Sequence, residues 1–121
     1  MAAWVDDAKP TLTQSWVNAA NPAVTGTVRW NAERQQGLLD VAALPSNVGS
    51  QQRYQLWIFD SSRDEKFPVD AGLFDVIAAQ TKLVFSPRVK VAKATHFMIT
   101  LEDANGAVVS NRAHIVAITQ P

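Results

Sequence analysis

The sequence predicts an all-β domain, an antiparallel β-sandwich of about eight short strands. Three observations support this fold class. Runs of β-branched and aromatic residues recur along the chain, turn signals separate them, and no long helical period is present. The chain has 121 residues, 47% of them hydrophobic and 18% charged, which suits a single globular domain with its own core.

Three strands are predicted in the first part of the chain. Residues 11–18 mix Thr, Leu, Trp and Val, and residues 24–30 alternate between apolar and polar side chains, the pattern of a half-buried strand. Residues 31–37 are polar and end in glycine, so we expect a hairpin loop there. Residues 38–44 form the third strand, which ends at Pro45 because proline cannot donate to a ladder.

The strand that begins at Tyr54 carries bulky side chains on both faces. Tyr54, Leu56 and Ile58 share one face, and Trp57 and Phe59 lie on the other. We therefore expect a central strand that is covered on at least part of each side.

Four further strands are predicted at residues 71–77, 83–85, 95–101 and 112–119. Between the first two, residues 78–80 could form one helical turn. Asn105-Gly106 is the strongest short hairpin signal in the chain and predicts a tight turn that places the last two strands side by side.

Composition excludes several classes of function. Lys plus Arg equals Asp plus Glu, at 11 each, so no concentrated basic surface for nucleic acid is expected. The chain has no cysteine, which removes disulfides, thiolate metal sites and cysteine nucleophiles. The missing cysteine pair also makes the sandwich immunoglobulin-like only in a loose sense. No apolar run approaches the roughly 20 residues of a membrane helix, and the acidic start does not match a signal peptide.

The sequence offers only weak candidates for a metal site or a catalytic residue. A metal site would need His96 and His114 with a third ligand such as Glu102 or Asp103, and the spacing fits no metal motif. Strand-edge or surface imidazoles are the simpler interpretation. No serine lies in a Gly-x-Ser-x-Gly elbow. We therefore expect no catalytic residue, metal or cofactor.

Five carboxylates surround the Tyr54 strand, and paired carboxylates can serve a glycosidase. Arg63 and Lys66 interleave with them, so a solvated loop with weak surface ion pairs is the favoured interpretation. These carboxylates are Asp60, Asp64, Glu65, Asp70 and Asp75.

The tryptophans leave an alternative open, because flat aromatic rings can stack on sugars. Trp30 and Trp57 lie among apolar strand residues and are expected in the core. Trp4 and Trp16 suit either strand packing or a partner surface. A glycan- or protein-binding β-sandwich module is therefore the competing hypothesis, and an exposed aromatic row would support it. A hydrolase would require a polar cluster in a cleft.

Four motifs occur in order along the chain. They are Leu44-Pro45, the Tyr-Gln-Leu-Trp run from Tyr54 to Trp57, the Ala-Gly-Leu-Phe run from Ala71 to Phe74, and Thr100-Leu101-Glu102 leading to Asn105-Gly106. Over roughly residues 24–119, this order and spacing resemble the extracytoplasmic C-terminal domain of the transmembrane anti-sigma-K factor (RskA-like) family. Family members often carry a Gly-Gly-Ser and proline-rich turn after the Thr-Leu-Glu strand, which residues 103–111 replace here.

The resemblance implies a regulatory role. Members of the family hold a sigma factor inactive through a cytoplasmic domain, a single membrane helix joins that domain to the outer one, and proteolysis frees the sigma factor. Residues 1–121 would be one extracytoplasmic domain on the periplasmic side of a bacterial cell membrane. Residues 1–10 would be a membrane-proximal segment or an artificial start.

The resemblance also implies the partners and the motif residues. The membrane helix and the sigma-binding domain would precede residue 1, so partners of this chain would be regulatory proteases or a signalling protein outside the membrane. We expect Tyr54, Trp57, Gly72 and Glu102 to be structural. Trp57 would be buried, Tyr54 would bond a nearby backbone group, and Gly72 would allow a close approach or an unusual φ.

Overall fold

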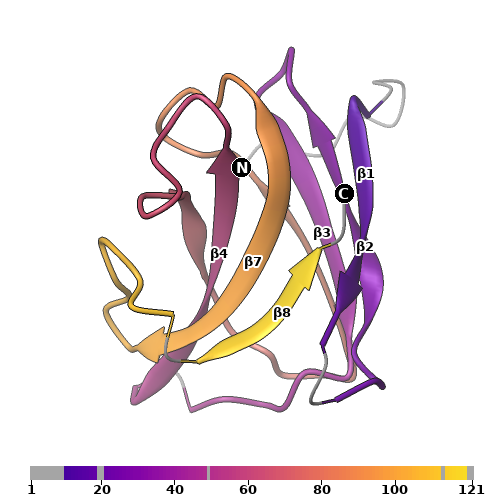
Figure 1. The fold of residues 1–121 in the computed structure, drawn as a ribbon. Coiled ribbons are helices and arrows are strands. Elements are labelled where there is room, and N and C mark those ends of the chain that lie inside the picture. Colours follow the sequence, from indigo (N-terminus) through magenta and orange to yellow (C-terminus); the bar gives the residue numbers. More distant parts are fainter. Residues whose placement is uncertain (1–9, 19–20, 49, 113, 120–121) are drawn as a thin grey trace.

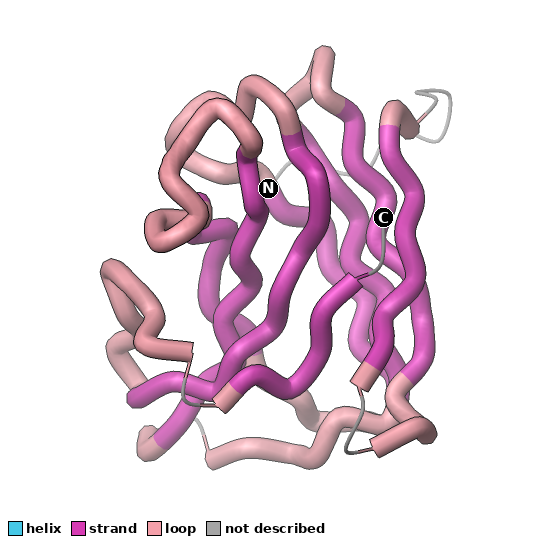
Figure 2. The backbone as a smooth tube through the Cα atoms, in the orientation of Figure 1, coloured by secondary structure: helices cyan, strands magenta, loops and turns pink. Residues whose placement is uncertain are grey.

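The computed structural model describes residues 10–18, 21–48, 50–112 and 114–119, and these ranges contain eight strands and no helix (Figures 1 and 2). The strands are β1 (Leu12–Val17), β2 (Thr25–Asn31), β3 (Gln36–Ala42), β4 (Gln52–Asp60), β5 (Val69–Phe74), β6 (Gln80–Phe85), β7 (Ala94–Asp103) and β8 (Ile115–Thr119). The predicted all-β fold with about eight strands is confirmed.

The strands form one antiparallel sheet in the order β5-β4-β7-β8-β1-β2-β3-β6, which curls into two facing layers (Figure 1). β1 joins the layers, because Leu12 to Ser15 pair with β2 whereas Trp16 and Val17 pair with β8. β5 and β6 are the two edges of this sheet. Immunoglobulin domains carry their strands in a different order, so the likeness is limited to the two-layer architecture.

The core lies between the layers and follows from period-two alternation. On β2, Val28 and Trp30 are buried, while Arg29 between them is exposed. The Trp30 ring stacks on Phe85 at a centroid distance of 6.0 Å. Gly37 leaves room for that ring, because a Cβ there would lie 2.2 Å from Phe85. Packed aromatic rings therefore fill the part of the core around Trp30 and Phe85.

The helical turn expected at residues 78–80 is absent. Ala78 and Ala79 form a bend, and Gln80 already begins β6. The Ala43 amide donates to the carbonyl oxygen of Ala79 at 2.8 Å, which continues the β3–β6 ladder beyond its last paired residues. Ladder pairing therefore overrides the local helical preference of two alanines.

The tight hairpin expected at Asn105-Gly106 is also absent. β7 and β8 do pair, but β7 ends at Asp103 and β8 begins only at Ile115, so no two-residue turn joins them. Within the pair, only Gly106 has a positive φ, of 76°, and its amide donates to Asp103 O at 2.8 Å in an ordinary turn. We call residues 104–112 the capping loop, since its contacts with the outer face of β4 and β7 hold it against the sheet.

Candidate regulatory site

Tyr54 joins three of the sequence motifs on the inner face of β4. Its side chain is buried, and its hydroxyl donates to the carbonyl oxygen of Pro45 at 2.6 Å. The expected bond from Tyr54 to a backbone group is therefore present. Its ring stacks on Phe74 at 5.6 Å. Burial raises the pKa of Tyr54, so the hydroxyl stays protonated and continues to donate.

Trp57 points to the opposite face of β4 and is fully buried there. Its indole Nε1 donates to Thr100 Oγ1 at 2.9 Å, and that hydroxyl donates to Glu102 Oε2 at 2.7 Å. Ser110 Oγ donates to the same carboxylate oxygen at 2.7 Å. A continuous hydrogen-bond chain thus links the Trp57 and Glu102 motif positions to the capping loop.

Gln55 holds the capping loop at a second point. Its carboxamide donates from Nε2 to Ala107 O at 3.0 Å and accepts at Oε1 from Ala107 N at 2.9 Å. A buried glutamine therefore pairs with the loop as a neighbouring strand would. Ala107 and Ile118 also pack on the satellite core of Trp57, Phe59 and Met98. The strand is covered on both sides, which agrees with its two-sided pattern.

Arg112 secures the far end of the capping loop. Its amide donates to Ser110 Oγ at 3.0 Å, its Nη2 donates to the carbonyl oxygen of Glu65, and its guanidinium lies 5.1 Å from the Phe59 ring centroid. Phe59 in turn stacks on His96 at 4.1 Å. Burial lowers the pKa of His96, the Glu65 charge opposes this change and the Arg112 charge adds to it.

Gly72 lies in an irregular stretch of β5, where the register with β4 shifts between Gln55 and Trp57. Its φ is 118°, and its amide donates to Asp70 Oδ1 at 2.8 Å. A Cβ at Gly72 would meet nothing within 4 Å. The glycine therefore supplies an unusual φ and does not serve a close approach.

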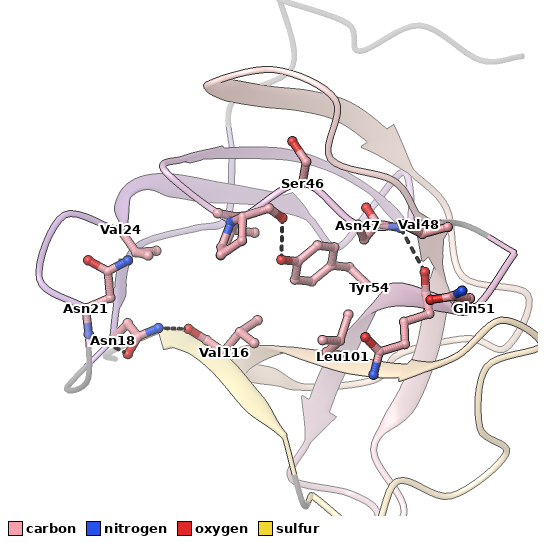
Figure 3. A pocket seen from close by; sticks show the side chains of 13 residues that line it. Asn18, Asn21, Val24, Ser46, Asn47, Val48, Gln51, Tyr54, Leu101 and Val116 are labelled. Atoms are coloured by element: carbon pink, nitrogen blue, oxygen red, sulfur yellow. Dashed lines mark hydrogen bonds between the residues drawn. The ribbon is translucent and has the colours of Figure 1, made fainter.

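The connection between β3 and β4 crosses one end of the sandwich (Figure 1), and a cavity of about 350 Å³ opens there (Figure 3). We call it the end cleft. It is lined by Asn18, Asn21, Val24, Leu44, Pro45, Ser46, Asn47, Val48, Gln51, Gln52, Tyr54, Leu101 and Val116. Figure 3 shows Tyr54 and its bond to Pro45 across the opening from Val116 and Leu101.

Asn47 fixes one wall of the end cleft. Its Nδ2 donates to Gln52 O and to Asp75 Oδ1, each at 2.9 Å, and its Oδ1 accepts from Val76 N at 2.7 Å. Arg53 forms an ion pair with Asp75 at 3.1 Å. The Asn47 bond lowers the pKa of Asp75, and Arg53 adds to that effect against the cost of desolvation. The wall is thus tied to β4 and to the segment after β5.

The five carboxylates do not form a common site. Asp64, Glu65, Asp70 and Asp75 are exposed, whereas Asp60 is buried. Burial alone would raise the pKa of Asp60, but bonds from the Ser62 hydroxyl and the amides of Ser62, Ala92 and Lys93 outweigh it and lower that pKa. Asp60 therefore holds two loops together. Sequence reasoning missed this role, although Ser61-Ser62 after a strand-ending Asp is a turn signal.

The two histidines differ in burial. His96 is half-buried on β7, and His114 is exposed just before β8. Among the described residues, no group of three or more His, Asp and Glu side chains could hold a metal ion. The described residues also contain no helix that could cross a bilayer.

The aromatic side chains are almost all inside. Trp16, Trp30 and Trp57 are buried, and among the described aromatic residues only Phe67 is exposed, at 47%. Trp4 lies outside the described residues. An exposed aromatic row, which the glycan-binding alternative would need, is therefore not found in the described part of the chain.

Comparison with known families assigns the fold to a regulatory class. A family model described as anti-sigma-K factor RskA, C-terminal, matches residues 2–111. No curated protein and no solved structure gives a significant match. The matched range includes all four sequence motifs, the Tyr54–Pro45 bond and the chain from Trp57 to Ser110. This chain therefore belongs to the RskA C-terminal family of anti-sigma-K factors, a family of regulatory proteins.

Proposed function

We propose that this chain is the extracytoplasmic regulatory domain of a membrane-anchored anti-sigma factor, and that its folded state restrains the proteolysis that frees the sigma factor. The family assignment supports the regulatory role. The domain would lie on the periplasmic side of a bacterial cell membrane. The sigma factor would be bound by the cytoplasmic part of the full-length protein. Proteases or a signalling protein outside the membrane would act on this domain.

The position of β1 is the observation that carries the proposed restraint. In the family arrangement the membrane helix precedes the domain, so the chain would enter the fold through β1. This strand is the seam between the two layers, since Leu12 to Ser15 pair with β2 in one layer and Trp16 and Val17 pair with β8 in the other. The pairing continues to Thr11, whose amide donates to Trp30 O at 2.7 Å and whose hydroxyl accepts from Ala32 N at 3.1 Å.

Because β1 joins the two layers, a protease can reach this strand only when the domain as a whole unfolds. Proteases cleave chain that is unpaired and extended, so residues from Thr11 onward become substrates only when the sheet opens. Extracting β1 would separate the two layers that it joins. A signal that opens the sandwich would therefore expose residues of β1 to proteases beside the membrane. No enzymatic step is assigned to the domain.

The test uses the full-length protein in cells with a reporter for the cognate sigma factor and a blot for the cleaved anti-sigma factor. Leu56→Ala and Trp57→Ala, which create cavities on the two faces of β4, should raise both readouts. The Asp64→Asn/Glu65→Gln double variant alters exposed carboxylates and should leave them near the wild-type level. If the cavity variants unfold the domain without changing either readout, restraint by folding is wrong.

A further inference from the structure

We propose that the end cleft is a binding site for a small, uncharged, hydroxyl-rich ligand of the size of a mono- or disaccharide. The proposal does not depend on the regulatory role. The cavity volume of about 350 Å³ falls within the range of roughly 300 to 1,000 Å³ that is typical of ligand pockets. Its strand residues come from β4, β7 and β8, and residues before β2 and after β3 complete the lining, so a ligand would contact several separate segments at once.

The charge of the lining determines which ligands fit. None of the lining residues is charged at neutral pH. The nearby Asp75 carboxylate is already bonded by Asn47 and Arg53. A charged ligand would lose its hydration without gaining a counter-charge, which is costly. Carboxamides and hydroxyls both donate and accept, so they complement a ligand whose groups also do both, and sugar hydroxyls meet this condition.

The polar groups of the lining fall into two sets, those that are hydrogen-bonded within the protein and those that can bond a ligand. The Tyr54 hydroxyl donates to the carbonyl oxygen of Pro45. The side-chain Nδ2 atoms of Asn47 and Asn18 donate to the carbonyl oxygens of Gln52 and Val116, as the dashed lines in Figure 3 show. Several other lining groups have no hydrogen-bond partner among the described residues. They are Nδ2 of Asn21, the hydroxyl of Ser46 and the side-chain carboxamides of Gln51 and Gln52. A wall that is fixed before binding reduces the entropy cost of holding a ligand.

Apolar side chains supply the remaining complementarity. Val24, Leu44, Leu101 and Val116 line the cleft beside the Tyr54 ring, and Val116 and Leu101 lie opposite Tyr54 in Figure 3. A pyranose carries C–H groups on its ring faces and hydroxyls at its rim, so it can contact this aliphatic surface while it bonds the carboxamides. No aromatic face lies exposed for stacking in the described lining, so we expect affinity in the millimolar range.

The experiment is an amide chemical-shift titration of the 121-residue chain. Glucose and N-acetylglucosamine are the neutral probes, and glucosamine and glucuronate are charged probes on the same ring. The neutral probes should shift amides around the cleft, such as Ser46, Gln52 and Val116. The charged probes should bind at least tenfold more weakly. If neither neutral probe shifts these amides, or if all four bind alike, the proposal is wrong.

Three variants connect the binding to the cleft. Val116→Phe fills the cavity, and Asn21→Asp introduces a charge while it keeps the Oδ1 that accepts from Ala23 N. Each should weaken binding of the neutral probes at least tenfold. Val108→Phe adds the same bulk at a side chain that is 93% exposed and does not line the cleft, so it should change nothing. Binding that survives both cleft variants in a folded chain would place the sugar elsewhere and overturn the proposal.

Discussion

The hydroxyl of Tyr54 donates to the carbonyl oxygen of Pro45 at 2.6 Å and so ties the inner face of β4 to the connection that crosses the end of the sandwich. Tyr54→Phe removes this bond but keeps the ring that stacks on Phe74. We expect a loss of about 0.5–1.5 kcal/mol, the usual net value of one such bond, by urea denaturation. Phe74→Leu, which removes the stacking and keeps the bond, is the matched comparison. An unchanged midpoint for Tyr54→Phe would show that the bond adds nothing to stability.

Trp57→Ala should destabilise the domain far more than Tyr54→Phe does, because the indole is fully buried and its Nε1 donates to Thr100 Oγ1. We expect a loss of about 3–5 kcal/mol, enough to threaten a domain of ordinary stability. Thermal unfolding followed by circular dichroism measures it. Phe67→Ala removes an aromatic ring that is 47% exposed, so its smaller effect is the control. Wild-type stability in the Trp57 variant would contradict the two-sided packing of β4.

Glu102→Gln tests the hold on the capping loop. One oxygen of the carboxylate accepts from Thr100 and from Ser110, and a neutral amide accepts both bonds less strongly. We expect a loss of about 1–2 kcal/mol together with faster amide hydrogen exchange at Ala107 and Ser110. Asp103→Asn changes the neighbouring, exposed carboxylate and should leave exchange as it is. Equal exchange in the two variants would mean that Glu102 does not anchor the loop.

Gly72→Ala and Gly26→Ala should differ in cost, although both glycines have positive φ, of 118° and 129°. An alanine Cβ at Gly72 would meet nothing within 4 Å, so only backbone strain of about 1–3 kcal/mol is expected. At Gly26 the Cβ would lie 2.1 Å from Asp40 O, which adds a steric clash with the ladder. Denaturant midpoints should therefore rank Gly26→Ala below Gly72→Ala. The reverse order would contradict the assigned backbone geometry.

Stability should fall as the pH is lowered through the titration range of His96. Burial lowers the pKa of this imidazole in the folded state from its ordinary value of 6.5, and the Glu65 and Arg112 charges act on it in opposite directions. The unfolded chain therefore binds more protons than the folded chain below about pH 6.5, so acid favours unfolding. His96→Gln should flatten this part of the stability profile, whereas His114→Gln at an exposed site should not. An unchanged profile in His96→Gln would show that another group titrates.

Much of the fold could be predicted from local pattern. Alternation on β2 and the two-sided pattern around Trp57 indicated strands and their buried faces, because the pleat places successive side chains on opposite sides of a sheet. Turn residues located the breaks between strands. The family motifs were also readable, since they consist of short runs of contiguous residues.

Local pattern could not place residues that act across the fold. Three sets of backbone and side-chain bonds join segments that are distant in sequence. The Ala43 amide donates to Ala79 O, the amides of Ala92 and Lys93 donate to the Asp60 carboxylate, and the Ala107 amide donates to Gln55 Oε1. No spacing rule records such contacts. The two-residue hairpin expected at Asn105-Gly106 was wrong for the same reason, because bonds from Gln55 on β4 hold the capping loop against the sheet.

The sequence by itself determined the strands, their buried faces and the family. Each follows from contiguous residues and the two-residue period of a strand. Only the tertiary structure decided that β1 is the seam between two layers, that the capping loop covers Trp57, and that uncharged side chains from separate segments surround one cleft. The physical reason is that sheet order and loop packing depend on long-range contacts, whose free energy comes from the joint burial of segments that are far apart along the chain.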